Sequence, residues 1–78
     1  MKKDNSRHIV TYQKIGKNIR KYRKNKGYSQ EELSFLISSA RNYIGCIERG
    51  EKFPSVAVIK DIANALGCEL YELCDDRL

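Results

Sequence analysis

The stretch GYSQEELSFLISSARNYIGCIERG, residues 27–50, contains the strongest structural signals in the chain. Ser29 followed by Glu32 is a capping box, in which the hydroxyl and the carboxylate each accept a hydrogen bond from a backbone N–H at the start of a helix. Apolar residues at helical spacing follow the cap, so we expect a short helix over about residues 29–37.

Ser38 and Ser39 interrupt this helix, because their hydroxyls compete for backbone groups and favour turns. A second short helix is predicted from about Ala40 to Arg49, and Gly50 ends it. Its apolar face consists of Tyr43, Ile44 and Ile47. The residues that fall mainly on the other side are Arg41, Asn42, Gly45 and Cys46.

Three more helices are predicted around this pair. Apolar residues three and four positions apart predict a helix over about residues 11–25, closed by Gly27. Ser55 caps a helix that ends at Gly67, with a buried stripe of Val56, Ile59, Ile62, Ala63 and Leu66. A final short helix carries Leu70 and Leu73. The sequence therefore predicts an all-α, five-helix bundle in which two short helices form a helix-turn-helix.

The charge of the chain is divided unevenly. Residues 1–26 contain ten Lys or Arg against Asp4 alone, whereas residues 27–78 contain five against nine Asp or Glu, which together make the net charge of +5. A basic segment of this density attracts DNA, RNA or an anionic membrane surface. A solvated helix face kept charged for solubility is the alternative interpretation.

Length and composition narrow the class of protein further. With 78 residues we expect one domain, residues 9–76, preceded by a flexible basic arm, residues 1–8, and no room for a domain that senses a small-molecule effector. The apolar runs are too short to span a bilayer, and no secretory signal follows the basic N-terminus, so we expect a cytoplasmic protein.

The residues needed for catalysis or metal binding are largely missing from the sequence. Cys46, Cys68 and Cys74 lack the spacing of zinc ligands and are odd in number, so neither a metal site nor a disulfide framework is expected. His8 is the single histidine, and no nucleophile has a matching base, so we expect no enzyme activity and no cofactor.

The order and spacing of several short motifs resemble the Cro/cI type of helix-turn-helix protein, also called xenobiotic-response-element-like, with the fold of the lambda-repressor DNA-binding domain. The resemblance covers about residues 15–73. The motifs that carry it are Gly27-Tyr-Ser-Gln-Glu-Glu-Leu33, Tyr43-Ile44, Ile47-Glu-Arg-Gly50, Pro54-Ser55 and Ala63-x-x-Leu66-Gly67.

This resemblance implies a role for several side chains. Those expected to face base edges or the adjoining backbone are Arg41, Asn42, Tyr43 and Cys46, with Arg41 suited to guanine and Asn42 to adenine. Those expected to hold DNA phosphates are Gln30, Arg49 and Lys52. Arg23 and Glu48 match a pair that forms an internal salt bridge in many members of the family.

Some positions depart from the pattern of the family. Ser38 stands where glycine is common, Ser39 where an apolar residue is common, and Ala40 where a Ser or Thr cap is common. The helix from about Ala40 to Arg49, which the resemblance implies is the recognition helix, could therefore start one residue away, with Ser38 or Ser39 as its cap. Gly45 costs about 1 kcal/mol in a helix relative to alanine. Cys46 replaces a long polar side chain and either touches a thymine methyl or sugar, or contributes nothing.

The resemblance implies a transcription regulator that binds double-stranded DNA. We expect a homodimer on a palindromic operator, because one short recognition helix reads too few base pairs. The expected dimer surface is Leu70, Tyr71, Leu73 and Cys74. A small autoregulating controller of a restriction-modification operon, or a phage-type repressor, fits best, and the acidic C-terminal segment is the candidate surface for contact with RNA polymerase. The alternative is a protein-interaction module, of the antitoxin or adaptor type, that no longer reads DNA.

Overall fold

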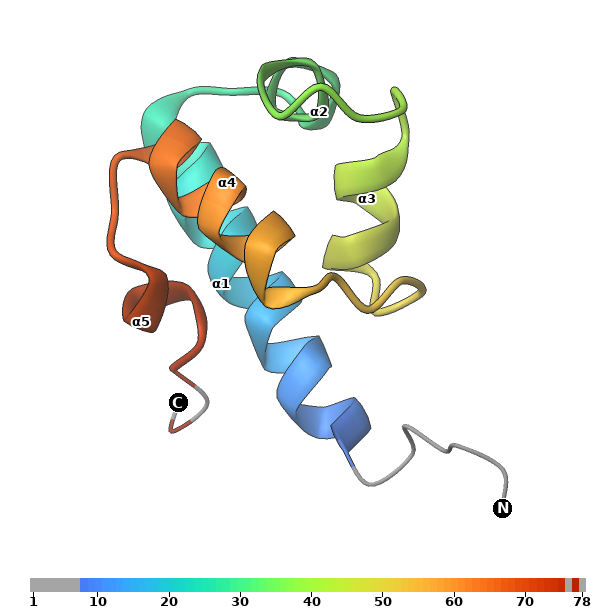
Figure 1. The fold of residues 1–78 in the computed structure, drawn as a ribbon, viewed down its shortest axis with the longest axis vertical. Coiled ribbons are helices and arrows are strands. Elements are labelled where there is room, and N and C mark those ends of the chain that lie inside the picture. The colour runs from blue at the N-terminus through green and yellow to red at the C-terminus, as the bar shows by residue number, and fades with distance from the viewer. Residues whose placement is uncertain (1–7, 76, 78) are drawn as a thin grey trace.

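The computed structural model describes residues 8–75 and 77 of the chain. These residues form five helices, α1 (Ile9–Lys26), α2 (Gln30–Leu36), α3 (Tyr43–Glu48), α4 (Val56–Leu66) and α5 (Leu70–Leu73), as Figure 1 shows. The predicted all-α bundle of five helices is confirmed. The expected arm, apart from His8, and Asp76 at the end of the predicted domain lie outside the described residues.

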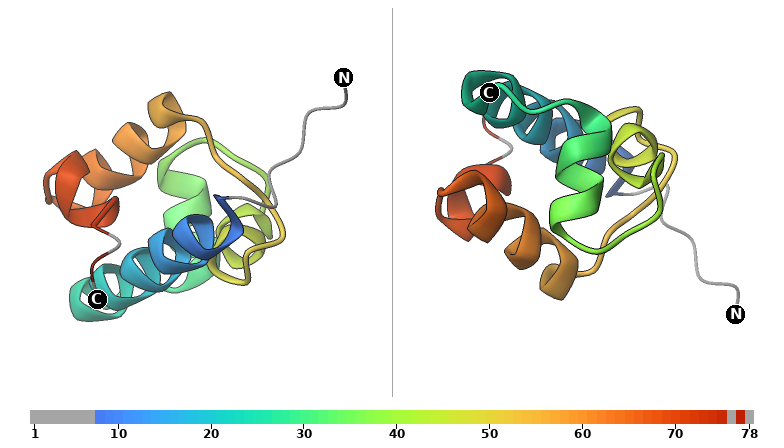
Figure 2. Two further views of the ribbon diagram at one scale, coloured as in Figure 1. Left: turned by 90° about the horizontal axis from the view of Figure 1, so that it is seen from below. Right: turned by 90° about the horizontal axis from the view of Figure 1, so that it is seen from above.

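Helix α1 is the longest helix and packs against three of the others. It contacts α3, α4 and α5, while α2 contacts α3 and α4. The apolar repeats predicted from sequence meet in one core, whose buried residues are Ile15, Ile19, Leu33, Ile44, Ile47, Ile59, Ile62, Ala63, Leu66 and Leu73. The prediction that Val56 belongs to the buried stripe of α4 is wrong, because Val56 is the first residue of that helix and is 68% exposed. Helices α3 and α5 lie on opposite sides of the bundle (Figures 1 and 2).

Gly16 allows α1 and α3 to approach each other closely. A Cβ atom at this position would lie 2.6 Å from the carbonyl oxygen of Ile47 and 3.0 Å from that of Glu48. Both atoms belong to the backbone of α3, which cannot move aside as a side chain can. Gly16 therefore sets the distance between the central helix and the short helix that the sequence marks for recognition.

Asn18 holds the C-terminal end of the chain on α1. Its amide is buried and donates to the carbonyl oxygens of Leu73, at 3.0 Å, and Asp75, at 2.7 Å. One turn further along α1, the Tyr22 hydroxyl donates to Glu72 at 3.1 Å. Because α5 has only four residues, these bonds from α1 supply order that so short a helix lacks by itself.

The turn between α2 and α3 contains a residue in the left-handed region. Ser38 has φ 57°, a conformation that costs an L-residue about 1 kcal/mol or more. The amides of Ser38 and Ser39 donate to the carbonyls of Phe35 and Ser34, both at 2.9 Å, and so satisfy the end of α2 as a Schellman motif does. Serine thus takes the position at which this motif usually has glycine.

The recognition helix begins later than predicted. The expected start at Ala40 is wrong, because residues 40–42 continue the turn and the Tyr43 amide donates to the Ala40 carbonyl at 3.0 Å. Neither Ser38 nor Ser39 caps the helix. Asn42 is the N-cap residue, and it makes no side-chain capping bond within the described residues. The helix also ends one residue earlier, at Glu48.

A buried hydroxyl from α2 replaces the missing cap. Ser34 is fully buried, and its Oγ accepts a hydrogen bond of 3.1 Å from the backbone amide of Ile44, in the first turn of α3. This amide is one of the donors that a helix start leaves without an intrahelical partner. Ser34 therefore joins the two helices of the motif at the point where α3 begins.

We expect Ser34→Ala to destabilise the protein by about 1–2 kcal/mol, because the buried Ile44 amide loses its acceptor. Hydrogen exchange measured by NMR should show the amide of Ile44 exchanging faster than in the wild type. Ser55→Ala is the matched control, since Ser55 caps α4 from an exposed position by the same kind of bond, to Val58 at 3.2 Å. Unchanged protection of Ile44 in Ser34→Ala would contradict this role.

Candidate nucleic-acid interface

The polar side of α3 and of the preceding turn is open to solvent. Arg41 and Asn42 are exposed in the turn, and the Arg41 side chain is 82% exposed. Tyr43 and Cys46 are half-buried one turn apart on α3, followed by exposed Arg49. Of the predicted base-facing residues, Arg41, Asn42 and Tyr43 therefore lie at the N-terminal end of a six-residue helix about 9 Å long, and Cys46 lies one turn further along it.

A buried ion pair connects α3, which carries this surface, to α1. The Arg23 Nε and Nη2 atoms donate to the two carboxylate oxygens of Glu48 at 2.7 and 3.1 Å, and the two side chains are 8% and 2% exposed. Arg23 also donates to the carbonyl of Tyr28 at 2.8 Å. The pair expected from the family resemblance is thus present and links α1, α3 and the start of α2.

Gln30 completes this network. Its Nε2 atom donates to Glu48 Oε1 at 2.9 Å, so the amide of α2 is held against α3. Glu48 accepts three hydrogen bonds from two side chains, which leaves little freedom for either partner. The arrangement fixes Gln30 and the backbone of α3 relative to each other before any ligand is bound.

Gly45 lies under Gln30 and Arg49. The prediction that Gly45 is on the open side of the helix is wrong, because the residue is buried. A Cβ atom here would lie 3.0 Å from Gln30 Oε1 and 3.1 Å from Arg49 Nη1. Glycine therefore provides the space in which these two side chains come together above α3.

Both arginines beside α3 have an acidic neighbour. The Arg49 guanidinium donates to Glu51 twice, at 2.9 and 3.2 Å, and to Cys46 Sγ at 3.7 Å. The bond from Arg49 lowers the pKa of Glu51 and raises the pKa of Arg49 itself. Arg41 Nε lies 3.8 Å from a carboxylate oxygen of Glu31, in a looser and more exposed pair.

Exposed basic side chains also occur along α1 and in the loop after α3. Lys52 is exposed in this loop. The exposed cations of α1 are Lys17, Arg20, Lys21, Lys24 and Lys26. At the N-terminal part of α1, Tyr12 packs on Phe53 with ring centroids 4.6 Å apart, which attaches the loop to the central helix.

The predicted dimer residues do not all lie on the surface. Leu73 is fully buried in the core of a single chain, so its assignment to a dimer interface is wrong. The apolar stripe of α5 packs inward because Asn18 and the core of α1 hold that face. Tyr71 is 72% exposed, and Leu70 and Cys74 are half-buried.

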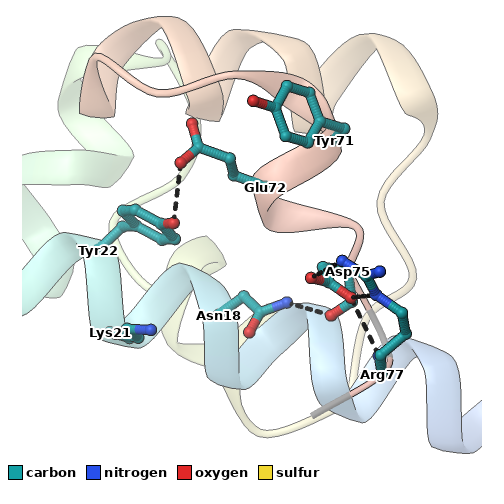
Figure 3. Close-up of a pocket in the computed structure, with 7 residues that line it drawn as sticks. All are labelled: Asn18, Lys21, Tyr22, Tyr71, Glu72, Asp75 and Arg77. Atoms are coloured by element: carbon teal, nitrogen blue, oxygen red, sulfur yellow. Dashed lines mark hydrogen bonds and ion pairs between the residues drawn. The ribbon is translucent and has the colours of Figure 1, made fainter.

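A polar hollow of about 450 Å³ lies between α1 and α5, next to Tyr71 (Figure 3). The polar side chains that line it are hydrogen-bonded within the chain. Tyr22 donates to Glu72, Asn18 donates to the backbone carbonyl of Asp75, and Arg77 donates to the Asp75 carboxylate. The bonds from Arg77 lower the pKa of Asp75 to about 2, so this carboxylate is ionised at neutral pH.

The cysteines are free thiols. Burial raises the pKa of Cys68 and Cys74, which keeps these thiols protonated at neutral pH and lowers their reactivity. Across residues 8–75 and 77, no group of three or more His, Cys, Asp or Glu side chains is placed to hold a metal ion. No helix in the same part of the chain is long and apolar enough to cross a membrane.

Several residues that shape this site were missed by sequence reasoning. Ser34 and Asn18 are polar residues inside apolar repeats, and that interruption is the signal that could have marked them as buried hydrogen-bonding groups. Gly16, in the middle of a long helix, could have indicated a close helix contact. Nothing in the sequence marks Glu51 as the partner of Arg49, because their pairing depends on where the two side chains lie in the structure.

The fold and this surface together define a helix-turn-helix protein. The helix-turn-helix family HTH_3 matches residues 19–73, and the chain belongs to this family, which is of the Cro/cI type. Its members are transcription regulators rather than a known class of enzyme.

Similar proteins and structures agree with this family. The chain is 41% identical over 58 residues to the transcriptional regulator YazB of Bacillus subtilis. This match covers 74% of this chain and 84% of YazB. The matches to SlrR and SinR of the same organism span only 41% and 58% of those proteins.

Two solved structures share the fold. The restriction-modification controller protein C.AhdI from Aeromonas hydrophila has 42% identity and a TM-score of 0.76, over 80% of this chain and 94% of that one. The biofilm regulator SinR, solved in complex with DNA, has 35% identity and a TM-score of 0.73, over 78% of this chain and 98% of that one.

Proposed function

We propose that the chain is a DNA-binding transcription regulator that places α3 and the preceding turn in the major groove. The observation that carries this proposal is the position of Arg41 and Asn42, which stand exposed at the N-terminal end of α3. In helix-turn-helix proteins the residues at this end of the recognition helix contact base edges. The buried Arg23–Glu48–Gln30 network holds α3 in place, so the reading side chains start from a rigid support.

Each side chain of the interface has a proposed role. Arg41 pairs with guanine through two parallel hydrogen bonds, and Asn42 reads adenine. Tyr43 and Cys46 contact base edges or the sugar beside them. The groups that hold phosphates are Gln30, Arg49 and Lys52, and the basic side of α1 adds sequence-independent attraction.

A homodimer on a palindromic operator is part of the proposal, because a helix of about 9 Å reads too few base pairs alone. The dimer surface is centred on Tyr71, with Leu70 and Cys74 beside it. Because α5 and α3 lie on opposite sides of the bundle, pairing through α5 leaves the two recognition helices at the outer sides of the dimer. Such a protein acts on chromosomal DNA in the cytoplasm as a small controller or repressor of its own operon.

RNA polymerase has little support as a further partner. Within the acidic C-terminal segment, Glu69 and Glu72 form the capping box of α5, Glu72 also binds Tyr22, and Asp75 binds Arg77. These carboxylates are engaged inside the chain. The alternative function, a protein-interaction module, is favoured by one observation: Phe35 on the outer side of α2 is 80% exposed.

Selection of bound sequences from a random double-stranded DNA pool, at about physiological salt, tests the proposed function. We expect an enriched inverted repeat with half-sites about one helical turn, roughly 34 Å, apart. Arg41→Ala should then reduce the preference for this site about 10- to 100-fold while leaving weak, salt-sensitive binding.

Lys52→Ala is the control variant, because loss of a phosphate contact weakens binding to all sequences alike. Undiminished site preference in Arg41→Ala would reject the assignment of this residue. If the folded wild-type protein enriches no sequence and Phe35→Ser abolishes binding to a partner protein, the protein-interaction module is the correct function.

A further inference from the structure

Arg49, the cation that follows α3, is paired with a carboxylate of the same chain. Arg49 Nε lies 2.9 Å from one oxygen of Glu51, and Arg49 Nη2 lies 3.2 Å from the other. Two parallel N–H···O bonds form the fork geometry in which arginine also holds a phosphate group. Glu51 thus presents two oxygens to Arg49 as a DNA phosphate would.

The position of the pair places it among the groups proposed to hold DNA. Arg49 Nη1 and Gln30 Oε1 both lie about 3 Å from the Cβ position above Gly45, and Arg49 Nη2 also contacts Cys46 Sγ. Gln30 and Arg49 therefore share the space that glycine leaves open. The side chains of Arg49 and Glu51 are both about half exposed, so a phosphate can reach the guanidinium without any movement of the fold.

We propose that Glu51 competes with DNA phosphate for Arg49 and so limits the sequence-independent affinity of this chain for DNA. This inference rests on the proposed function, since it supposes that DNA reaches Arg49. In the free protein the pair is neutral overall, so this end of α3 attracts DNA less than an isolated arginine does. On DNA, Arg49 exchanges Glu51 for a phosphate, and Glu51 is left as an unpaired anion.

The exchange has a consequence for salt dependence. A cation that neutralises one phosphate releases counterions from DNA, and this release makes log affinity fall with log salt by about 0.9 per phosphate. When Arg49 leaves Glu51, the freed carboxylate attracts cations in turn. The net release is therefore smaller with Glu51 than without it, and the salt dependence is shallower.

The direction of the effect separates this role from a positioning role. If Glu51 held Arg49 in the orientation needed for phosphate, its removal would weaken binding. If Glu51 competes with phosphate, its removal strengthens binding. A general repulsion between any acidic side chain and DNA also strengthens binding, but that effect does not depend on Arg49.

The experiment measures binding of the full chain to a random-sequence DNA duplex by fluorescence anisotropy over a range of salt concentrations. We expect Glu51→Gln to raise affinity about three- to fivefold at low salt, the effect of losing one exposed ion pair, and to steepen the salt dependence. In an Arg49→Gln background the same change should have almost no effect, because the pair is already absent. Asp61→Asn is the control, since it removes one exposed negative charge from α4.

Three outcomes overturn the inference. Unchanged or weaker binding of Glu51→Gln shows that Glu51 does not compete with phosphate. An equal gain in the Arg49→Gln background, or from Asp61→Asn, shows general repulsion instead. Failure of the wild-type protein to bind random or selected DNA overturns the proposed function as well, whereas binding without a gain from Glu51→Gln overturns this inference alone.

Discussion

Glu48→Gln should destabilise the protein by about 3–5 kcal/mol, the largest effect expected of any substitution considered for this chain. The Glu48 carboxylate is 2% exposed and accepts bonds from Arg23 Nε, Arg23 Nη2 and Gln30 Nε2. Glutamine has the same shape but no charge, so the guanidinium of Arg23 stays buried without its counterion. Thermal unfolding should show a melting temperature at least about 12 °C lower, as expected for a domain of this size.

Two further variants make this result interpretable even if Glu48→Gln does not fold. Glu51→Gln breaks an exposed Arg–Glu pair and should leave the melting temperature almost unchanged. The double variant Arg23→Met, Glu48→Leu removes both buried charges and should recover most of the stability. It should still bind DNA more weakly, because Gln30 loses the acceptor that orients it. A Glu48→Gln protein within about 1 kcal/mol of the wild type would show that burial of this pair is not what holds α3 on α1.

Gly16→Ala should destabilise the protein by about 2–3 kcal/mol, although alanine is the better helix former by about 1 kcal/mol. The added Cβ would lie 2.6 Å from the Ile47 carbonyl oxygen and 3.1 Å from the Glu48 Cα atom, so α1 and α3 must separate. Urea denaturation should give a lower midpoint with an unchanged slope.

The same substitution should weaken DNA binding beyond its effect on stability, because α3 is displaced relative to the basic side of α1. Asn25→Ala, at an exposed and uncharged position of the same helix, is the control and should change stability by less than about 0.5 kcal/mol. Wild-type stability of Gly16→Ala would mean that the contact between the two helices relaxes without loss, and that Gly16 does not set their distance.

The sequence by itself determined the elements and the family of this protein. The capping box at Ser29 and the glycine at the end of α1 are local signals, because each depends on hydrogen bonds or backbone angles within a few residues. The apolar repeats are also local, and they identified most of the residues that form the core, Val56 being the exception. The motifs in order were enough to indicate the helix-turn-helix class and to suggest which side chains stand at its surface.

The tertiary structure alone decided where α3 begins and what holds it. The helix starts at Tyr43 rather than Ala40 because its cap comes from Ser34, a residue of another helix ten positions away from the amide it binds. Leu73 belongs to the core rather than to a dimer surface because Asn18, on α1, binds the carbonyl of Leu73 from 55 positions away. Likewise, only the tertiary structure shows that Arg49 pairs with Glu51 and that Gly45 leaves space for the side chains of Gln30 and Arg49. Each of these depends on groups brought together by packing, and residue type and local spacing do not specify such contacts.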